Sequence, residues 1–192
     1  FVLGCIIYAL FYRYVDDFII TNNLLSSIVS IFLFFTMYFI TLSISDKDVL
    51  SLKKPKNHSL IFVLLGLIVN FLANIISTIV SYLFSLWKVS SPQPDSLFKY
   101  SNTKLGVFIY FLSVAIIPAI FEELICRGLV LGLLRKFGDR FAIITSAIFF
   151  ALIHGNIEQG VFAFTIGLYY ALVVIKTSSI FPAIFLHFLN NF

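Results

Sequence analysis

Three charged side chains within a long apolar run constrain this chain more than any other feature of its sequence. Glu122, Glu123 and Arg127 lie inside an apolar run that extends from Leu105 to Leu134. A run of this length is typical of a membrane-spanning α-helix. An ionised side chain at the centre of such a helix costs about 2.5 to 3.5 kcal/mol unless it is paired or neutralised. The sequence therefore predicts a membrane helix whose charged groups serve a function.

The composition is that of an integral membrane protein. Of the 192 residues, 60% are hydrophobic and 11% are charged, and the mean hydropathy is +1.05. The apolar runs are continuous rather than alternating at every second residue, so they predict helices and not the strands of a membrane barrel. The net charge of +4 lies at the ends of the runs, which suits lipid headgroups better than nucleic acid. We expect an all-α, polytopic bundle in a lipid bilayer.

Hydropathy divides the chain into seven apolar segments, and we expect six to eight transmembrane helices. The segments cover residues 1–12, 24–44, 60–87, 105–134, 141–154, 161–175 and 180–192. The chain opens on Phe1 within apolar sequence, has its single methionine at Met37, and ends in a segment that is short for a full span. We therefore expect residues to be missing at both ends.

The basic residues of the loops predict an orientation in the membrane. If the spans alternate, four basic residues fall on one side and eight on the other, the eight being Lys47, Lys53, Lys54, Lys56, Arg135, Lys136, Arg140 and Lys176. Basic loops stay in the cytoplasm, so we place loops 45–59 and 135–140 there. Abundant Phe, Ile, Asn and Lys, which A/T-rich codons encode, favour a bacterial plasma membrane protein.

The ionisable residues expected at membrane depth fall in the second half of the chain. They are Glu122, Glu123, Arg127, His154 and His187. Counted at about 1.5 Å per residue from the cytoplasmic charges, the acidic and imidazole groups and Asn191 come out roughly 15 to 22 Å deep. The sequence therefore predicts one polar layer, or cavity, to which several helices contribute.

Helix spacing separates the two glutamates. Glu123 and Arg127 are four residues apart with the acid first, the favoured order for an ion pair. Glu122 is rotated by about 100° from Glu123 around the helix and is left without a cation of its own. A carboxylate of this kind in a low-dielectric cavity is suited to act as a general base. Pro118 removes a backbone hydrogen bond one turn earlier and is expected to kink or open the helix. The alternative is that both glutamates pair with Arg127.

Other polar residues occur in pairs at four-residue spacing. His187 and Asn191 share a helix face and could donate hydrogen bonds to an oxyanion, and Phe150 and His154 pair a bulky wall with an imidazole. Asn70 and Asn74 are interpreted as hydrogen-bonding to a neighbouring helix, with substrate contact as the alternative. Gly128 and Gly132 are interpreted as a close approach of two helices. Cys126 is interpreted as an inert buried thiol.

Three patterns in a fixed order carry a family resemblance: Glu122-Glu123-x-x-x-Arg127, Phe150-x-x-x-His154 and His187-x-x-x-Asn191. Together they resemble the CAAX-endopeptidase and bacteriocin-processing (CPBP, or Abi) family of intramembrane proteases. The resemblance covers residues 105–192, which we expect to form the catalytic core, while residues 1–104 contain membrane helices without a motif. An aromatic residue commonly precedes the arginine in this family, and Cys126 stands there instead.

The resemblance implies a membrane-embedded endopeptidase and a role for each motif residue. Glu122 would activate the attacking water with the help of His154, while His187 and Asn191 would stabilise the oxyanion. Glu123, Arg127 and Phe150 would support this geometry. We prefer a mechanism without a metal cofactor, although Glu122, His154 and His187 could instead hold Zn²⁺ with an open position for water.

The expected substrate is a peptide or a membrane-associated protein. Eukaryotic relatives trim prenylated C-terminal tripeptides, and bacterial ones are associated with pheromone or bacteriocin maturation and with self-immunity. The main alternative is a non-catalytic immunity or interaction protein with the same polar layer. A proton-coupled transporter is less favoured, because transporters repeat their topology in both halves and here the buried ionisable groups fall in one half.

Overall fold

The structure is a computed structural model that describes residues 19–44, 49–56, 58–87, 104–155 and 157–192. Helices make up most of this part of the chain, and it contains no β-strand. The all-α prediction is therefore confirmed for the described residues. The first predicted segment, 1–12, lies outside them.

The helices follow the predicted apolar segments closely. The first two are α2 (Ile19–Ile44) and α3 (Ser59–Leu86). One continuous helical run follows, formed by α4 (Lys104–Phe111), η2 (Leu112–Ile116), α5 (Ile117–Glu123), η3 (Leu124–Val130), α6 (Leu131–Leu134) and η4 (Arg135–Phe137). The last three helices are α7 (Asp139–Leu152), α8 (Ile157–Thr177) and α9 (Phe181–Asn191).

Three helices of the described chain are long and apolar enough to cross a membrane: Ser59–Leu86, Val107–Phe137 and Gln159–Thr177. The protein is thus a membrane protein, but the structure does not confirm about seven spans. The helices α7 and α9 have 14 and 11 residues, which at about 1.5 Å per residue is short of a ~30 Å hydrocarbon core. Hydropathy alone does not separate such short buried helices from full spans.

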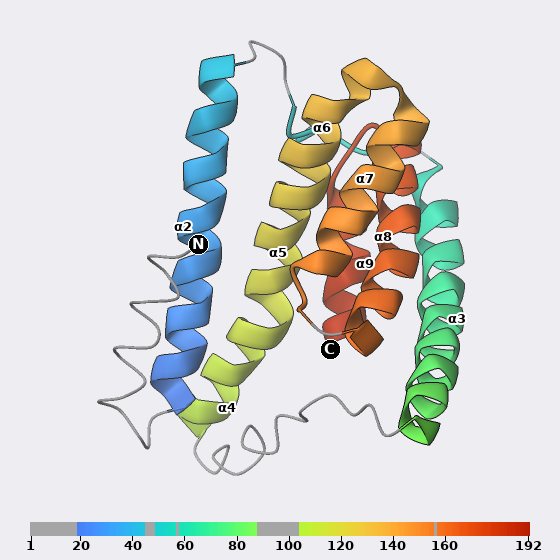
Figure 1. The fold of residues 1–192 in the computed structure, drawn as a ribbon. Coiled ribbons are helices and arrows are strands. Elements are labelled where there is room, and N and C mark those ends of the chain that lie inside the picture. Colours follow the sequence, from blue (N-terminus) through green and yellow to red (C-terminus); the bar gives the residue numbers. More distant parts are fainter. Residues whose placement is uncertain (1–18, 45–48, 57, 88–103, 156) are drawn as a thin grey trace.

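The helices form a bundle with α2 and α3 at opposite sides (Figure 1). Helix α8 packs against both α7 and α3, and α9 packs against α5, α8 and α3. Helix α2 packs against α5 and its neighbours in the long helical run. The helices after residue 104 therefore form the interior, and they include every residue of the three predicted motifs except His154, which lies just beyond α7.

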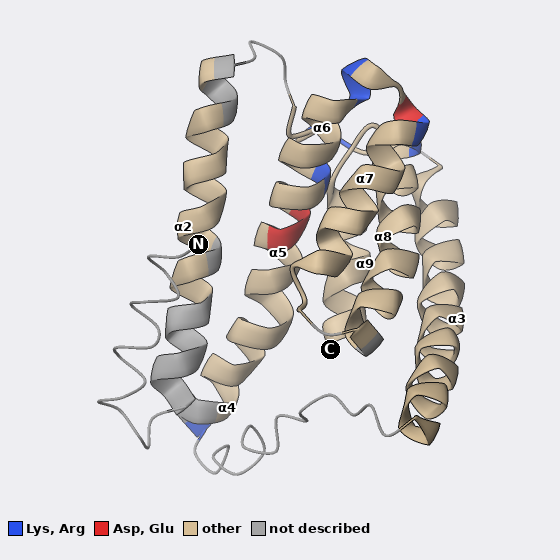
Figure 2. Ribbon diagram, viewed as in Figure 1, with Lys and Arg blue, Asp and Glu red and all other residues tan. Residues whose placement is uncertain are grey.

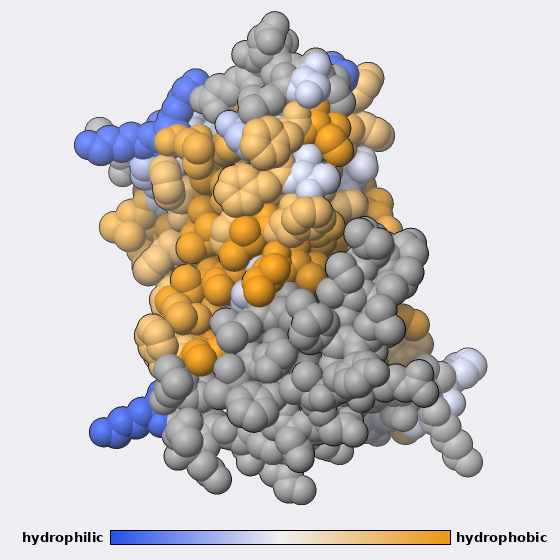
Figure 3. Space-filling view, turned by 90° about the vertical axis from the view of Figure 1, so that its left-hand side faces the viewer, coloured by the Kyte–Doolittle hydropathy of each residue, from blue (hydrophilic) through white to orange (hydrophobic). Residues whose placement is uncertain are grey.

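Charged residues of the described chain lie mainly at the two ends of the bundle (Figure 2). The segment that leads into α3 and the turn between η4 and α7 lie at the same end of the bundle (Figure 1). Two loops on the same side of the membrane must lie at the same end. On the face that Figure 3 shows, the described surface between the ends is mostly apolar. The exception at mid-height is the charged group on α5 and η3 (Figure 2).

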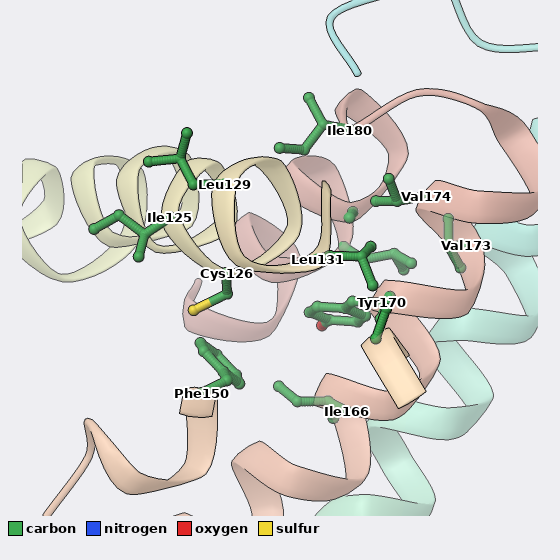
Figure 4. Packing of buried hydrophobic residues seen from close by; sticks show 14 of the residues in the cluster. Ile125, Cys126, Leu129, Leu131, Phe150, Ile166, Tyr170, Val173, Val174 and Ile180 are labelled. Carbon is green, nitrogen blue, oxygen red and sulfur yellow. The ribbon is translucent and has the colours of Figure 1, made fainter. Parts of the chain in front are cut away.

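The interior is filled by large apolar side chains from η3, α7 and α8. Phe150, Ile166 and Tyr170 are all buried around η3 (Figure 4). On another side, the segment before α3 lies close to the helical run, because a Cβ on Gly132 would be 2.4 Å from the carbonyl oxygen of Val49. The close approach at Gly128 and Gly132 is therefore made by this segment, whereas a helix was expected.

Candidate active site

A fully buried ion pair lies at the centre of the site. Nη1 of Arg127 is 2.8 Å from Oε1 of Glu123, and both side chains have 0% exposure. The pair predicted from the four-residue spacing is present, although η3 is a π-helical segment and not a regular α-helix. Two buried charges tolerate a low-dielectric interior only when they are closely paired, and this distance meets that condition.

His187 links the two glutamates. Its Nδ1 lies 2.9 Å from Oε1 of Glu123, and its Nε2 lies 3.9 Å from Oε2 of Glu122. Because an ionised carboxylate only accepts hydrogen bonds, Nδ1 carries the hydrogen and Nε2 of the neutral ring keeps a lone pair. The distance to Glu122 is too long for a direct hydrogen bond and suits a bridging water.

Glu122 is the accessible end of this polar chain. Its side chain is 25% exposed, while that of His187 is 4% exposed. Arg127 pairs with Glu123, and Glu122 faces His187. The arrangement runs from a buried guanidinium, through a carboxylate and an imidazole, to a carboxylate that a substrate or water can reach.

The Arg127 guanidinium lies over the faces of two aromatic rings. Its Cζ is 4.1 Å from the centroid of Phe150 and 5.5 Å from that of Tyr170, and both rings lie beside η3 (Figure 4). Within the described chain, Nε and Nη2 have no hydrogen-bond partner. The electron-rich ring faces attract the cation and offset part of this deficit. A Cβ on Gly167 would be 3.3 Å from Nη2, so the lack of a side chain there leaves space for the guanidinium.

His154 lies just beyond the end of α7 and is held by Phe150. Its ring centroid is 4.9 Å from that of Phe150, and its Nδ1 is 2.7 Å from the Phe150 carbonyl oxygen. Since a carbonyl only accepts, Nδ1 carries the hydrogen and Nε2 remains available as an acceptor. His154 and His187 both lie within electrostatic range of Glu122, and the Phe150 ring also contacts that of His187 at 5.6 Å.

Asn191 contacts the helix that carries the glutamates. Its Nδ2 donates a hydrogen bond of 3.1 Å to the carbonyl oxygen of Val114. In a regular α-helix the residue four positions later would donate to this carbonyl, but that residue is Pro118, which has no N–H. The backbone there is the π-helical η2. Asn191 therefore supplies a donor to a carbonyl that lacks its usual α-helical partner, with a second amide hydrogen remaining.

Comparison with known families decides the relationship of this site. Residues 104–192 match the family model described as type II CAAX prenyl endopeptidase Rce1-like. The match covers slightly less than half of the chain, which is similar to that family over this segment. The family recognised from the three motifs is thereby confirmed, and with it the class of CAAX-type membrane protease. No curated protein and no solved structure matches the chain.

The CAAX-endopeptidase segment contains one buried site residue that sequence reasoning missed. Tyr170 lies beside Arg127, and its hydroxyl donates a hydrogen bond of 3.0 Å to Oδ1 of Asn70 on α3. An aromatic residue in an apolar span carries no distinguishing signal. Asn70 does contact a neighbouring helix, as predicted, whereas Nδ2 of Asn74 bonds to the Asn70 carbonyl within α3.

The polar side chains of the site also bear on a metal ion. Within the part of the chain that the structure describes, no three His, Cys, Asp or Glu side chains are grouped so that they could hold one. The zinc site that Glu122, His154 and His187 could form stays a prediction. Cys126 is fully buried, which is typical of an inert thiol.

Proposed function

We propose that the chain is an intramembrane endopeptidase in which Glu122 activates water to hydrolyse a peptide bond of a membrane-associated peptide or protein. The observation that carries this proposal is the 3.9 Å separation between Nε2 of His187 and Oε2 of Glu122. Two acceptors at this distance can hold one water between them. The family match supports the reaction class.

In the proposed reaction, the Glu122 carboxylate takes a proton from the water as the water oxygen attacks the substrate carbonyl carbon. The carbonyl electron pair moves to oxygen and gives a tetrahedral oxyanion. Glu122 then passes its proton to the amide nitrogen, the C–N bond breaks, and an acid and an amine leave. His154 contributes the lone pair of Nε2, which can orient the water.

The oxyanion needs hydrogen-bond donors. The second amide hydrogen of Asn191 is one candidate. His187 is the other when its ring takes a second proton from solvent before the substrate binds; its Nε2–H then donates to the oxyanion, and Glu122 and Nε2 of His154 hold the water. The Glu123 carboxylate, 2.9 Å from Nδ1, stabilises this imidazolium, and Arg127 fixes that carboxylate in turn. In this proposal Glu123 and Arg127 support the site, with Phe150 packed against both histidines.

The test uses purified protein in detergent with a farnesylated CAAX peptide and a mixture of unprenylated peptides, with products read by mass spectrometry. We expect Glu122→Gln to abolish cleavage and to leave the unfolding temperature unchanged, because Glu122 forms no part of the buried pair. Retained cleavage would exclude Glu122 from the mechanism. The same assay with a chelator tests the metal-free mechanism, which activity restored by Zn²⁺ would contradict.

The comparison of the farnesylated peptide with the unprenylated peptides tests which class of substrate the protein cleaves. Preference for the farnesylated peptide would place the chain with prenyl-processing relatives, and preference for unprenylated peptides would support a role in peptide maturation. If the wild-type protein cleaves neither, the non-catalytic immunity or interaction function becomes the better interpretation.

A further inference from the structure

Helix α8 carries two adjacent tyrosines that both donate hydrogen bonds to α3. The hydroxyl of Tyr169 donates to the carbonyl oxygen of Phe62 at 2.7 Å, and that of Tyr170 donates to Oδ1 of Asn70 at 3.0 Å. The two bonds connect the same pair of helices. The two tyrosines differ in the residues that their rings contact.

The ring of Tyr170 lies against the polar chain of the site. It is fully buried, its centroid is 5.5 Å from Cζ of Arg127, and it is 6.1 Å from the ring centroid of His187. A cation within about 6 Å of an aromatic ring is attracted to its face. Phe150 lies closer, at 4.1 Å, so Arg127 has two aromatic neighbours and one carboxylate partner.

We propose that Tyr170 is a positioning residue of the proposed peptidase, and that Asn70 fixes its orientation from α3. The inference rests on the proposed function. Nε and Nη2 of Arg127 have no hydrogen-bond partner in the described chain, so the rings and the Glu123 carboxylate define where the guanidinium lies. The guanidinium then holds Glu123, and Glu123 holds Nδ1 of His187.

Asn70 extends this positioning into the part of the chain outside the family match. Its side chain is 7% exposed, and its Nδ2 lies 3.5 Å from the carbonyl oxygen of Leu186, the residue before His187. The amide of Asn70 therefore contacts both the Tyr170 hydroxyl and the backbone beside the site histidine. Helix α3 thus determines the position of α9 as well as that of the Tyr170 ring.

Loss of the Tyr170 ring should affect the catalytic step and not substrate binding. Tyr170 is buried behind Arg127, and the accessible group of the site is Glu122. A displaced guanidinium would let Glu123 and His187 move, and a misplacement of about 1 Å can lower a rate by roughly 100-fold. A change confined to kcat is therefore the expected signature.

The experiment compares Tyr170→Leu, Tyr170→Phe and Asn70→Ala with the matched control Tyr169→Phe. We expect Tyr170→Leu to lower kcat by roughly 10- to 100-fold with KM little changed. Tyr170→Phe keeps the ring beside Arg127 but loses the bond to Asn70, so Tyr170→Phe and Asn70→Ala should each lower kcat, by less than Tyr170→Leu does. Tyr169→Phe removes an equivalent bond between α8 and α3 and should keep the wild-type kcat. Equal kcat values for Tyr170→Leu and Tyr169→Phe, or a change in KM alone, would overturn the inference.

A second measurement does not depend on catalysis. Diethyl pyrocarbonate modifies accessible imidazoles, and mass spectrometry of peptides gives the rate for His187 separately from His154 and His58. We expect Tyr170→Leu to raise the His187 rate several-fold and Tyr169→Phe to leave it unchanged. An unchanged rate in Tyr170→Leu would refute the positioning role even if cleavage is lost. Cleavage retained by Glu122→Gln would instead refute the proposed function while this labelling still tests Tyr170.

Discussion

Glu122 and Glu123 are adjacent in the sequence, yet their side chains have different surroundings. Glu123 is fully buried and contacts both Arg127 and His187, whereas Glu122 is partly exposed. The helix period of about 100° per residue explains the division, and the spacing to Arg127 predicted it. The contact to His187 joins residues 64 positions apart and depends on how α9 packs, which the spacing within one helix does not contain.

At the residue scale, removing one partner of the buried pair should be worse than removing both. Glu123→Gln leaves the Arg127 charge buried without its counter-charge, and such a change destabilises by about 3 to 5 kcal/mol. The double variant Glu123→Gln with Arg127→Met removes both charges and should recover most of the unfolding temperature in detergent. Neither variant should cleave peptide, because His187 loses its carboxylate partner in both. A double variant less stable than the single one would contradict the pairing argument.

At the element scale, the sequence predicted where helices lie but not their type. The predicted segments from 24–44 onward each overlap a helix, because hydropathy marks buried length. The π-helical segments on either side of α5, Leu112–Ile116 and Leu124–Val130, were not predicted, since residue preferences do not distinguish a wider helical turn. Pro118 was the one local signal, and its missing N–H accounts for a change in hydrogen bonding at Val114.

The bond between Asn191 and Val114 should depend on Pro118. Asn191→Ala removes a donor and should destabilise by about 1 kcal/mol. In a Pro118→Ala background the helix regains an N–H that can bond to the Val114 carbonyl, so the same change should cost less. Chemical unfolding of the four proteins in this cycle measures the coupling, and strictly additive effects would disprove it.

The same cycle separates the two roles of Asn191. If Asn191 also donates to the oxyanion, Pro118→Ala should restore stability to the Asn191→Ala variant without restoring kcat. Recovery of both together would show that Asn191 acts through the helix alone.

At the scale of the whole molecule, the three motifs share one interior because the helices after residue 104 pack between α2 and α3. Counting residues from the charged loops predicted a common depth for the motif residues, and the three-motif order predicted the family. The contacts that residues before 104 make with these helices were not predictable in full. The four-residue spacing marked Asn70 and Gly132 as contact positions, but nothing marked Tyr170 and Val49, which lie in distant segments, as their partners.

The junction between the segment before α3 and the helical run should not tolerate a side chain at Gly132. A Cβ there would lie 2.4 Å from the Val49 carbonyl oxygen and 3.1 Å from its carbonyl carbon, and backbone does not move as a flexible side chain does. We expect Gly132→Ala to destabilise by about 1 to 3 kcal/mol, as overpacking usually does. Thermal unfolding in detergent measures this effect.

Gly160 offers the matched control, since a Cβ there would meet the Ala151 carbonyl oxygen at an ordinary 3.5 Å. Gly160 lies within α8, where alanine is favoured over glycine by about 0.5 to 1 kcal/mol. Gly160→Ala should therefore leave the unfolding temperature unchanged or raise it. If both variants unfold at the same temperature, the segment before α3 does not restrain the helix that carries Glu122. A lower temperature for Gly132→Ala alone shows that the chain outside the family match holds the site-bearing helix in place.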